Sequence, residues 1–123
     1  MTNKYFGELE FDHGWVAKRQ IRLFNRIYDI DYVLAYESEK EILPVQEKAW
    51  TAYTEHETDN LRCFEELMSE YSSDAETRFV PASLYFDREG GCALLCDDAD
   101  DLDEGIAVCI MPEKCIVDQS DYL

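Results

Sequence analysis

The sequence predicts an α+β domain, with antiparallel β-meanders and one main helix in the order βββ-α-ββββ. Apolar and polar residues alternate at period two before residue 37. Apolar residues then recur every three to four positions from 44 to 71, and short apolar runs separated by turn residues follow. Strands and helix do not alternate along the chain, so we expect antiparallel pairing within a single domain spanning residues 1–123.

Three strands are expected before the helix. Residues 4–11 place Tyr5 on the apolar face of a half-buried strand that ends at the turn Asp12-His13-Gly14. Residues 15–24 and 27–36 continue the alternation on either side of Asn25-Arg26. Asn tolerates the positive φ that a two-residue turn requires, so these two strands should form a hairpin.

One main helix is expected from about Pro44 to Tyr71, because Pro suits a first helical turn and the apolar residues repeat at helical spacing. It could break near residues 58–60, Thr-Asp-Asn, which are poor helix formers. Its apolar stripe should pack on the sheet, and the opposite face carries an acidic ridge that includes Glu55 and Glu66. Later strands are expected at residues 83–86, 92–96, 106–111 and 115–117.

The net charge of −17 is unevenly distributed. Residues 1–36 are balanced, with five acids and five bases, whereas residues 37–76 carry twelve acids and three bases and residues 77–123 carry eleven and three. A negative field of this kind repels nucleic acid and anionic membrane and attracts basic partners. The alternative interpretation is that the charge serves solubility alone.

The five cysteines and the chain start bear on the compartment. No run of about 20 apolar residues and no signal-peptide pattern is visible, so we expect a soluble cytoplasmic protein. An odd number of cysteines argues against a disulfide framework, and none has the Cys-x-x-Cys spacing of a zinc site. We therefore expect the cysteines to be small core residues and expect no metal or cofactor.

The densest chemical feature is the stretch Asp97–Glu104, in which six of eight residues are carboxylates. It lies between the apolar runs 92–96 and 105–110, so it is expected to be an exposed connection between buried strands. Such a connection could present charge to a basic partner, or could only keep the sheet from pairing with other chains. The candidate partner-binding residues are Asp97, Asp98, Asp100, Asp101, Asp103 and Glu104, with Glu55 and Glu66 on the helix.

Catalytic patterns are weak, so we do not expect an enzyme. Asp101 and Asp98 each start an EF-hand register that fails at later ligand positions. His13 and His56 stand apart from any nucleophile motif, and Gly90-Gly91 precedes a strand where a phosphate loop would precede a helix. A calcium site of another type, or hydrolysis by paired carboxylates, stays open as an alternative.

Several short motifs together resemble a known bacterial domain family of unknown function. They are Tyr5-Phe6-Gly7-Glu8-Leu9 with Asp12 and Gly14-Trp15, Leu23-Phe24, the helix start around Gln46, and Leu94-Leu95 leading through acids to Asp103-Glu104-Gly105-Ile106-Ala107-Val108. Members of that family are β-rich with a central helix and look like immunity proteins encoded beside polymorphic or contact-dependent growth-inhibition toxins. The family's Trp and His in the acidic connection are absent here.

The resemblance implies a protein that forms a heterodimer with a cognate toxin domain, often a basic nuclease, and blocks it. An acidic inhibitor would compete for the cationic cleft with which such a toxin grips nucleic acid. The leading hypothesis is therefore a cytoplasmic immunity protein. The alternatives are a carboxylate-based metal-binding protein or hydrolase, and a general acidic scaffold protein without a toxin partner.

Overall fold

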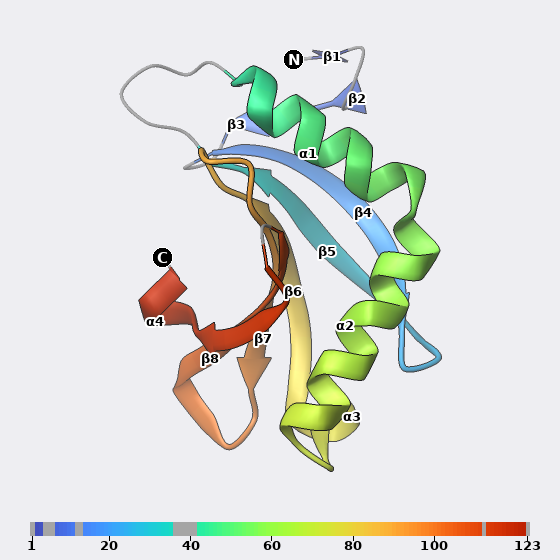
Figure 1. The fold of residues 1–123 in the computed structure, drawn as a ribbon, viewed down its shortest axis with the longest axis vertical. Helices are drawn as coiled ribbons and strands as arrows, with labels where there is room; N and C mark the ends of the chain where they lie inside the picture. Colours follow the sequence, from blue (N-terminus) through green and yellow to red (C-terminus); the bar gives the residue numbers. More distant parts are fainter. Residues whose placement is uncertain (1, 4–6, 12–13, 36–41, 112, 123) are drawn as a thin grey trace.

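The computed structural model describes residues 2–3, 7–11, 14–35, 42–111 and 113–122 (Figure 1). Its strands are β1 Thr2–Asn3, β2 Gly7–Glu8, β3 Glu10–Phe11, β4 Trp15–Leu23, β5 Arg26–Leu34, β6 Phe79–Phe86, β7 Cys92–Asp98, β8 Asp101–Met111 and β9 Cys115–Asp118. Its helices are α1 Pro44–Glu55, α2 Glu57–Tyr71, α3 Ala75–Arg78 and α4 Gln119–Tyr122. The predicted positions of Tyr5, Asp12-His13 and Tyr36 lie outside the described residues.

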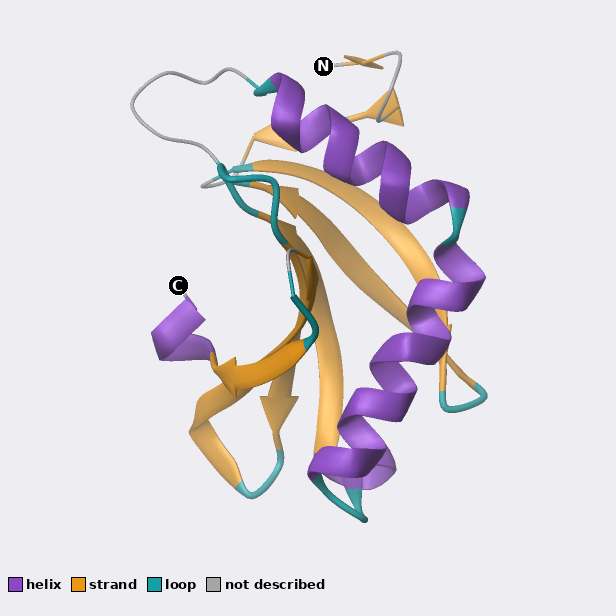
Figure 2. Ribbon diagram, in the orientation of Figure 1, coloured by secondary structure: helices purple, strands orange, loops and turns teal. Residues whose placement is uncertain are grey.

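The main sheet has the order β3-β4-β5-β6-β7-β8-β9, and β1 and β2 form a separate two-stranded sheet. The α+β class is confirmed, but the purely antiparallel meander is wrong, because β5 and β6 run parallel. The reason is the helical crossover. Helices α1 and α2 carry the chain back along one face of the sheet, so β6 starts at the same end of the sheet as β5 and runs in the same direction (Figure 2).

Strands β4 and β5 form the predicted hairpin, with continuous pairing from Trp15↔Leu34 to Leu23↔Arg26. Its two turn residues are Phe24 and Asn25, with φ of 50° and 62°, one position earlier than expected. Two successive positive φ values match the right-handed twist of the strands. The backbone N–H of Phe24 donates to the Glu65 carboxylate at 3.0 Å, so α2 holds the turn in this conformation.

The expected single main helix is in fact two helices, since the chain breaks at His56 with φ −129° and ψ 36°. This is two residues before the segment identified as a weak point. The Asn60 side chain donates to the carbonyl of Tyr53 at 3.0 Å and so satisfies an acceptor at the end of α1. Asn60, a poor helix former, thus also stabilises the break between α1 and α2.

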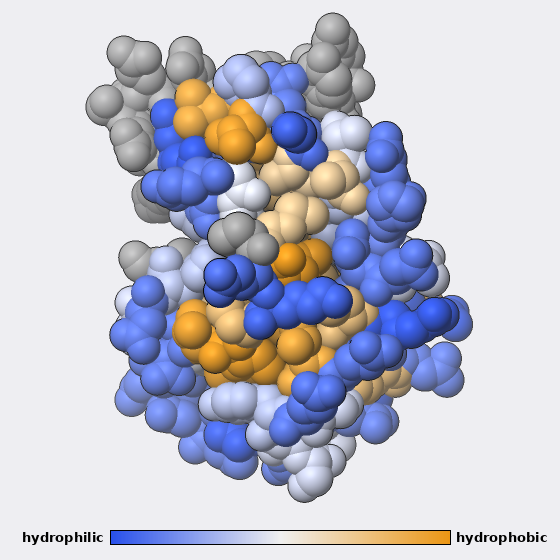
Figure 3. Space-filling view, viewed as in Figure 1, coloured by the Kyte–Doolittle hydropathy of each residue, from blue (hydrophilic) through white to orange (hydrophobic). Residues whose placement is uncertain are grey.

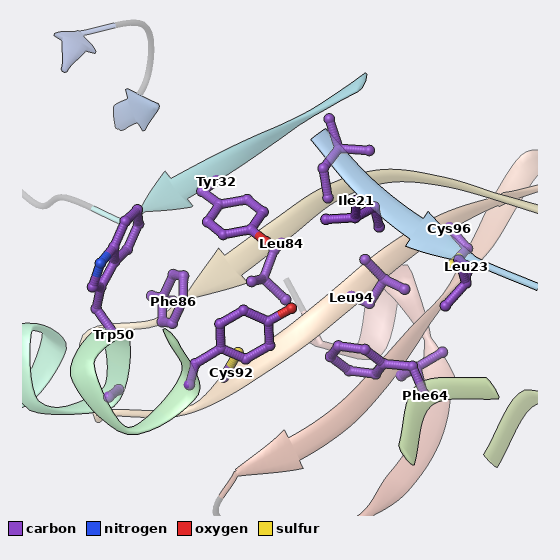
Figure 4. Close-up of a cluster of buried hydrophobic side chains, with 14 of the residues drawn as sticks. Ile21, Leu23, Tyr32, Trp50, Phe64, Leu84, Phe86, Cys92, Leu94 and Cys96 are labelled. Carbon is purple, nitrogen blue, oxygen red and sulfur yellow. The ribbon is translucent and has the colours of Figure 1, made fainter. Parts of the chain in front are cut away.

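Helices α1 and α2 cover one face of the sheet and enclose the main core (Figure 4). Tyr32 makes edge-to-face contacts with Trp50 and Tyr53, at ring-centroid distances of 5.5 and 5.9 Å. The Tyr32 hydroxyl donates to the Glu57 carboxylate at 3.1 Å. Burial raises the pKa of both tyrosines, so they remain protonated phenols at physiological pH. The core is therefore rich in aromatic rings beneath α1, and Phe64 of α2 extends it toward Leu94 of β7 (Figure 4).

The opposite face of β7 and β8 carries a smaller apolar cluster formed by Ala93, Leu95, Ala107 and Cys109. Helix α4 packs over it through Tyr122, whose hydroxyl donates to Asp87 at 3.0 Å. The part of the described chain after β8 therefore covers this face, with Val117 of β9 and Tyr122 of α4 packed against the cluster. None of the helices in the described ranges is long and apolar enough to cross a membrane.

The cysteines only partly follow the expectation of core positions. Cys92 and Cys96 are buried on the helix-covered face together with Leu94, as the alternation predicted. Cys109 is buried on the other face, whereas Cys63 is half-buried and Cys115 is exposed. The prediction is wrong for Cys115, because this residue begins β9, the edge strand of the sheet, and is exposed there.

Candidate protein-binding surface

The acidic stretch is a tight β-hairpin, which we call the acidic hairpin (residues 97–104). Strand β7 continues to Asp98 and β8 begins at Asp101, so the connection is only Ala99-Asp100. Asp98 and Asp101 face each other across the two strands. The predicted flanking strands are confirmed, but the prediction of an eight-residue exposed connection is wrong. Most of the carboxylates project from paired strands that hold their backbone fixed.

Asp98 faces inward and has only 8% of its side chain exposed. Arg78, the last residue of α3, donates from Nε and Nη2 to its two carboxylate oxygens, each at 3.0 Å. The N–H of Ala99 donates to the Arg78 carbonyl at 2.8 Å. Hydrogen bonds from Arg78 lower the pKa of Asp98. Asp98 was expected to be exposed; instead it ties the hairpin to α3.

Glu104 also bonds within the protein. Its carboxylate accepts hydrogen bonds from the hydroxyl of Ser120 at 2.8 Å and from the Ser120 backbone N–H at 3.2 Å. Gln119 donates to the carbonyls of Cys96 at 2.8 Å and Ile106 at 3.4 Å. The β8 strand of the acidic hairpin is thus bonded to α4, and Glu104 positions that helix.

Four carboxylates of the hairpin face solvent: Asp97, Asp100, Asp101 and Asp103. Asp101 accepts a hydrogen bond from the N–H of Asp103 at 3.2 Å, and Asp100 lies 3.4 Å from Arg78 Nε. Within the described part of the chain, this last contact is the one ion pair that the four make. Figure 3 shows hydrophilic residues over the lower left of the molecule, where Figure 1 shows the hairpin. The four exposed aspartates form a negatively charged surface, which we call the acidic tip.

The two helical candidates lie apart from this tip. Glu55 ends α1 at the junction with α2, on the other side of the molecule from the hairpin (Figure 1). Glu66 is exposed on α2, and no described hydrogen bond or ion pair joins it to the hairpin. Nearer to the tip are the exposed Asp74 and Glu76 at the start of α3. Sequence reasoning did not assign these two to the site.

Arg78 is the residue that sequence reasoning missed and that organises the tip. A signal existed, since an aspartate at an inward position of a strand needs a cation, but twenty positions separate the two residues and several bases were available.

Among the described residues, no group of three or more His, Cys, Asp or Glu could hold a metal ion.

A groove of about 390 Å³ lies between the β4–β5 turn and α2. Its lining residues are Arg22, Asn25, Thr58, Leu61, Arg62 and Glu65. Both arginines are exposed and Glu65 lies beside them, so the groove lining is of mixed charge, whereas the hairpin carries carboxylates alone.

Replacing Arg78 with Met should lower the melting temperature at pH 7. The folded pKa of Asp98 is depressed, so its stabilising contribution is complete above its unfolded value of about 3.9 and is lost as the pH falls through the folded value. The difference in melting temperature between wild type and Arg78→Met should therefore shrink below about pH 4. Thermal unfolding followed by circular dichroism between pH 7 and pH 2 measures it.

The exposed Lys114 supplies the control, because Lys114→Met removes the same charge without touching Asp98. A loss at Arg78 that stays constant down to pH 2, or that Lys114→Met reproduces, would contradict the assigned role of this ion pair.

Comparison with protein-family models, with curated proteins and with solved structures finds no match to this chain. What the protein does is therefore inferred from its own residues.

Proposed function

We propose that the protein is an immunity protein that binds and neutralises a cognate, basic toxin domain, such as a nuclease, and is not itself an enzyme. The observation that carries this proposal is the acidic tip, where four exposed carboxylates stand on a braced β-hairpin. The resemblance to toxin-associated immunity proteins in the sequence points the same way. The proposed partner is the toxin domain in a heterodimer in the cytoplasm, with neither nucleic acid nor membrane as a ligand.

The bracing of the hairpin favours a binding role. Arg78 holds the hairpin to α3, and Glu104 holds it to α4. Carboxylates fixed on such a frame lose little conformational entropy on binding, and each can accept two hydrogen bonds from an arginine of the partner. The proposed contacts are Asp97, Asp100, Asp101 and Asp103. Asp98 and Glu104 contribute by shaping the hairpin.

The overall charge favours rapid association. A net charge of −17 produces a long-range field that accelerates encounter with a cationic partner, and the tip concentrates that field. A toxin that grips phosphates needs a cationic cleft, so the tip can occupy the surface that the nucleic acid would occupy. Glu55 and Glu66 contribute to the field from a distance.

The proposal is tested with a variant in which the four exposed aspartates of the tip become asparagine. Its partner in the assay is the product of the neighbouring gene, which the proposal takes to be the toxin domain. At low salt, we expect the association rate to fall about tenfold or more and its dependence on ionic strength to weaken. Stopped-flow fluorescence measures the rate, and protection of a nucleic-acid substrate measures neutralisation.

A matched control loses the same four charges elsewhere on the surface. Its substitutions are Glu70→Gln, Glu89→Gln, Glu113→Gln and Asp121→Asn, all at exposed positions. The control should associate faster than the hairpin variant. Equal rates for the two variants would remove the tip from the interface, and a wild-type protein that fails to bind or neutralise the toxin would refute the proposed function.

A further inference from the structure

Two of the five cysteines lie directly opposite each other on neighbouring strands. In the antiparallel pair β8–β9, Cys109 is the partner of Cys115. The register is regular over the four pairs that end there, starting from Ile106↔Asp118. Directly opposite residues in such a ladder project to the same face of the sheet. The two side chains are therefore neighbours across the strands.

The spacing of this pair suits a disulfide. Opposite residues in antiparallel strands have Cα atoms about 4.5 or 5.5 Å apart, depending on the type of pair. Disulfides span Cα distances of about 4.4 to 6.8 Å. Cys109 and Cys115 form the last of the four regular pairs, so their side chains lie side by side. A bond between the sulfurs thus requires side-chain rotation and little movement of the backbone.

The two thiols differ in their access to solvent. Cys115 is exposed on the edge strand, whereas Cys109 has 7% of its surface exposed and packs in the cluster under α4. The other cysteines do not compete. Cys92 and Cys96 are buried on the opposite face of the sheet, and Cys63 lies on α2. An oxidant in solution therefore reaches Cys115 first, with Cys109 behind it.

We propose that Cys109 and Cys115 form a reversible dithiol–disulfide pair whose oxidant is a small-molecule disulfide of the glutathione type. The Cys115 thiolate attacks one sulfur of the oxidant, forms a mixed disulfide and releases one thiol. Cys109 then gives up its proton, attacks the Cys115 sulfur and releases the second thiol. The protein loses two electrons and two protons, and the oxidant becomes two thiols.

The second step depends on the ionisation of Cys109. Burial, together with the neighbouring Cys115, raises the pKa of Cys109 to about 12. Only a small fraction of Cys109 is thiolate at neutral pH, which slows closure of the ring. The rate of closure should rise with pH from 7 to 9, because the thiolate fraction rises over that range.

The disulfide would act on the part of the fold that α4 covers. Strand β9 is the edge of the sheet and leads directly into α4, which bonds to Glu104 of the acidic hairpin. Joining β9 to β8 fastens this edge and the helix behind it. Oxidation should therefore slow hydrogen exchange of the β9 amides and stabilise the protein.

The test incubates the native wild-type protein with oxidised glutathione. Thiols titrated in denaturant should fall from the five of the reduced chain to three, with a loss of about 2 Da in mass. Peptide mapping should link Cys109 to Cys115. Closing so short a ring should raise the melting temperature by a shift on the order of 5 °C, which a reductant reverses.

Two single variants make the outcome specific. Cys115→Ser, at an exposed position, should abolish the loss of mass and the thermal shift, whereas Cys63→Ser should leave both unchanged. Retention of all five thiols, a stable mixed disulfide at Cys115 without closure, or a link between two chains would each overturn the proposal. Mapping that finds any other pair of cysteines would also overturn it.

Discussion

Replacing Gln46 with Glu should destabilise the protein by about 4 kcal/mol at pH 7. Gln46 is fully buried at the start of α1. Its amide nitrogen donates to the carbonyls of Ala35 at 2.9 Å and Phe86 at 3.3 Å, and its oxygen accepts from the N–H of Leu43 at 2.9 Å. A carboxylate keeps the last bond but turns a negative charge toward two carbonyl oxygens in a dry site.

The loss should depend on pH in a defined direction. Burial and the two carbonyls raise the folded pKa of the new carboxyl group above its unfolded value of about 4.3. With a raised pKa, the carboxyl group binds its proton more tightly in the folded state than in the unfolded state. The variant therefore regains stability as the pH falls and the carboxyl group becomes protonated. Once protonated, it can donate one hydrogen bond. The measurement is urea denaturation of variant and wild type at pH 7 and pH 5.

The control is Gln46→Ala, which removes all three hydrogen bonds of Gln46 without adding a titratable group. It should cost about 3 kcal/mol, and the cost should be the same at both pH values. The comparison with wild type at each pH removes the general effect of protonating surface carboxylates. Equal pH dependence in the two variants would contradict this account of Gln46.

The hairpin of β4 and β5 was predictable because its signals are local. Strict alternation on both sides of Asn25 determines the pairing, and only the turn was displaced by one residue. The parallel pairing of β5 with β6 was not predictable in this way. It depends on the path of two helices across the sheet, which brings Ser83 opposite Asp31 from a distance of 52 positions.

The acidic stretch was predictable as a charged feature, but the direction of each side chain was not. A register shift between Cys96 and Asp98 changes which carboxylates face inward. The charges of residues 97 and 98 argue against a strand that continues this far. The hydrogen bonds from Arg78 compensate the buried charge of Asp98, so β7 does continue to it. Likewise, the short apolar run 115–117 indicates a strand but not that this strand lies at the edge, where Cys115 is exposed.

Replacing Gly105 with Ala should cost about 3 kcal/mol, because a methyl group there would overlap a backbone carbonyl that cannot move aside. A Cβ at this position would meet the carbonyl oxygen of Cys96 on the neighbouring strand and the side-chain amide of Gln119. The φ of Gly105 lies outside the range that strains other residues, so the cost comes from the contact alone. Relief would require β8 to move away from β7 at the base of the acidic hairpin.

A double-mutant cycle separates the two contacts of that methyl group. Gln119→Ala alone should cost about 1.5 kcal/mol, since it removes the hydrogen bonds to the carbonyls of Cys96 and Ile106. The double variant should lose less than the sum of the two single losses, because the methyl group then displaces no amide. Most of the loss should remain, since the Cys96 carbonyl still occupies the space.

Urea denaturation gives the three free energies of unfolding. Strict additivity would show that Gln119 does not pack against this position, and a neutral Gly105→Ala would show that the strands separate there at no cost.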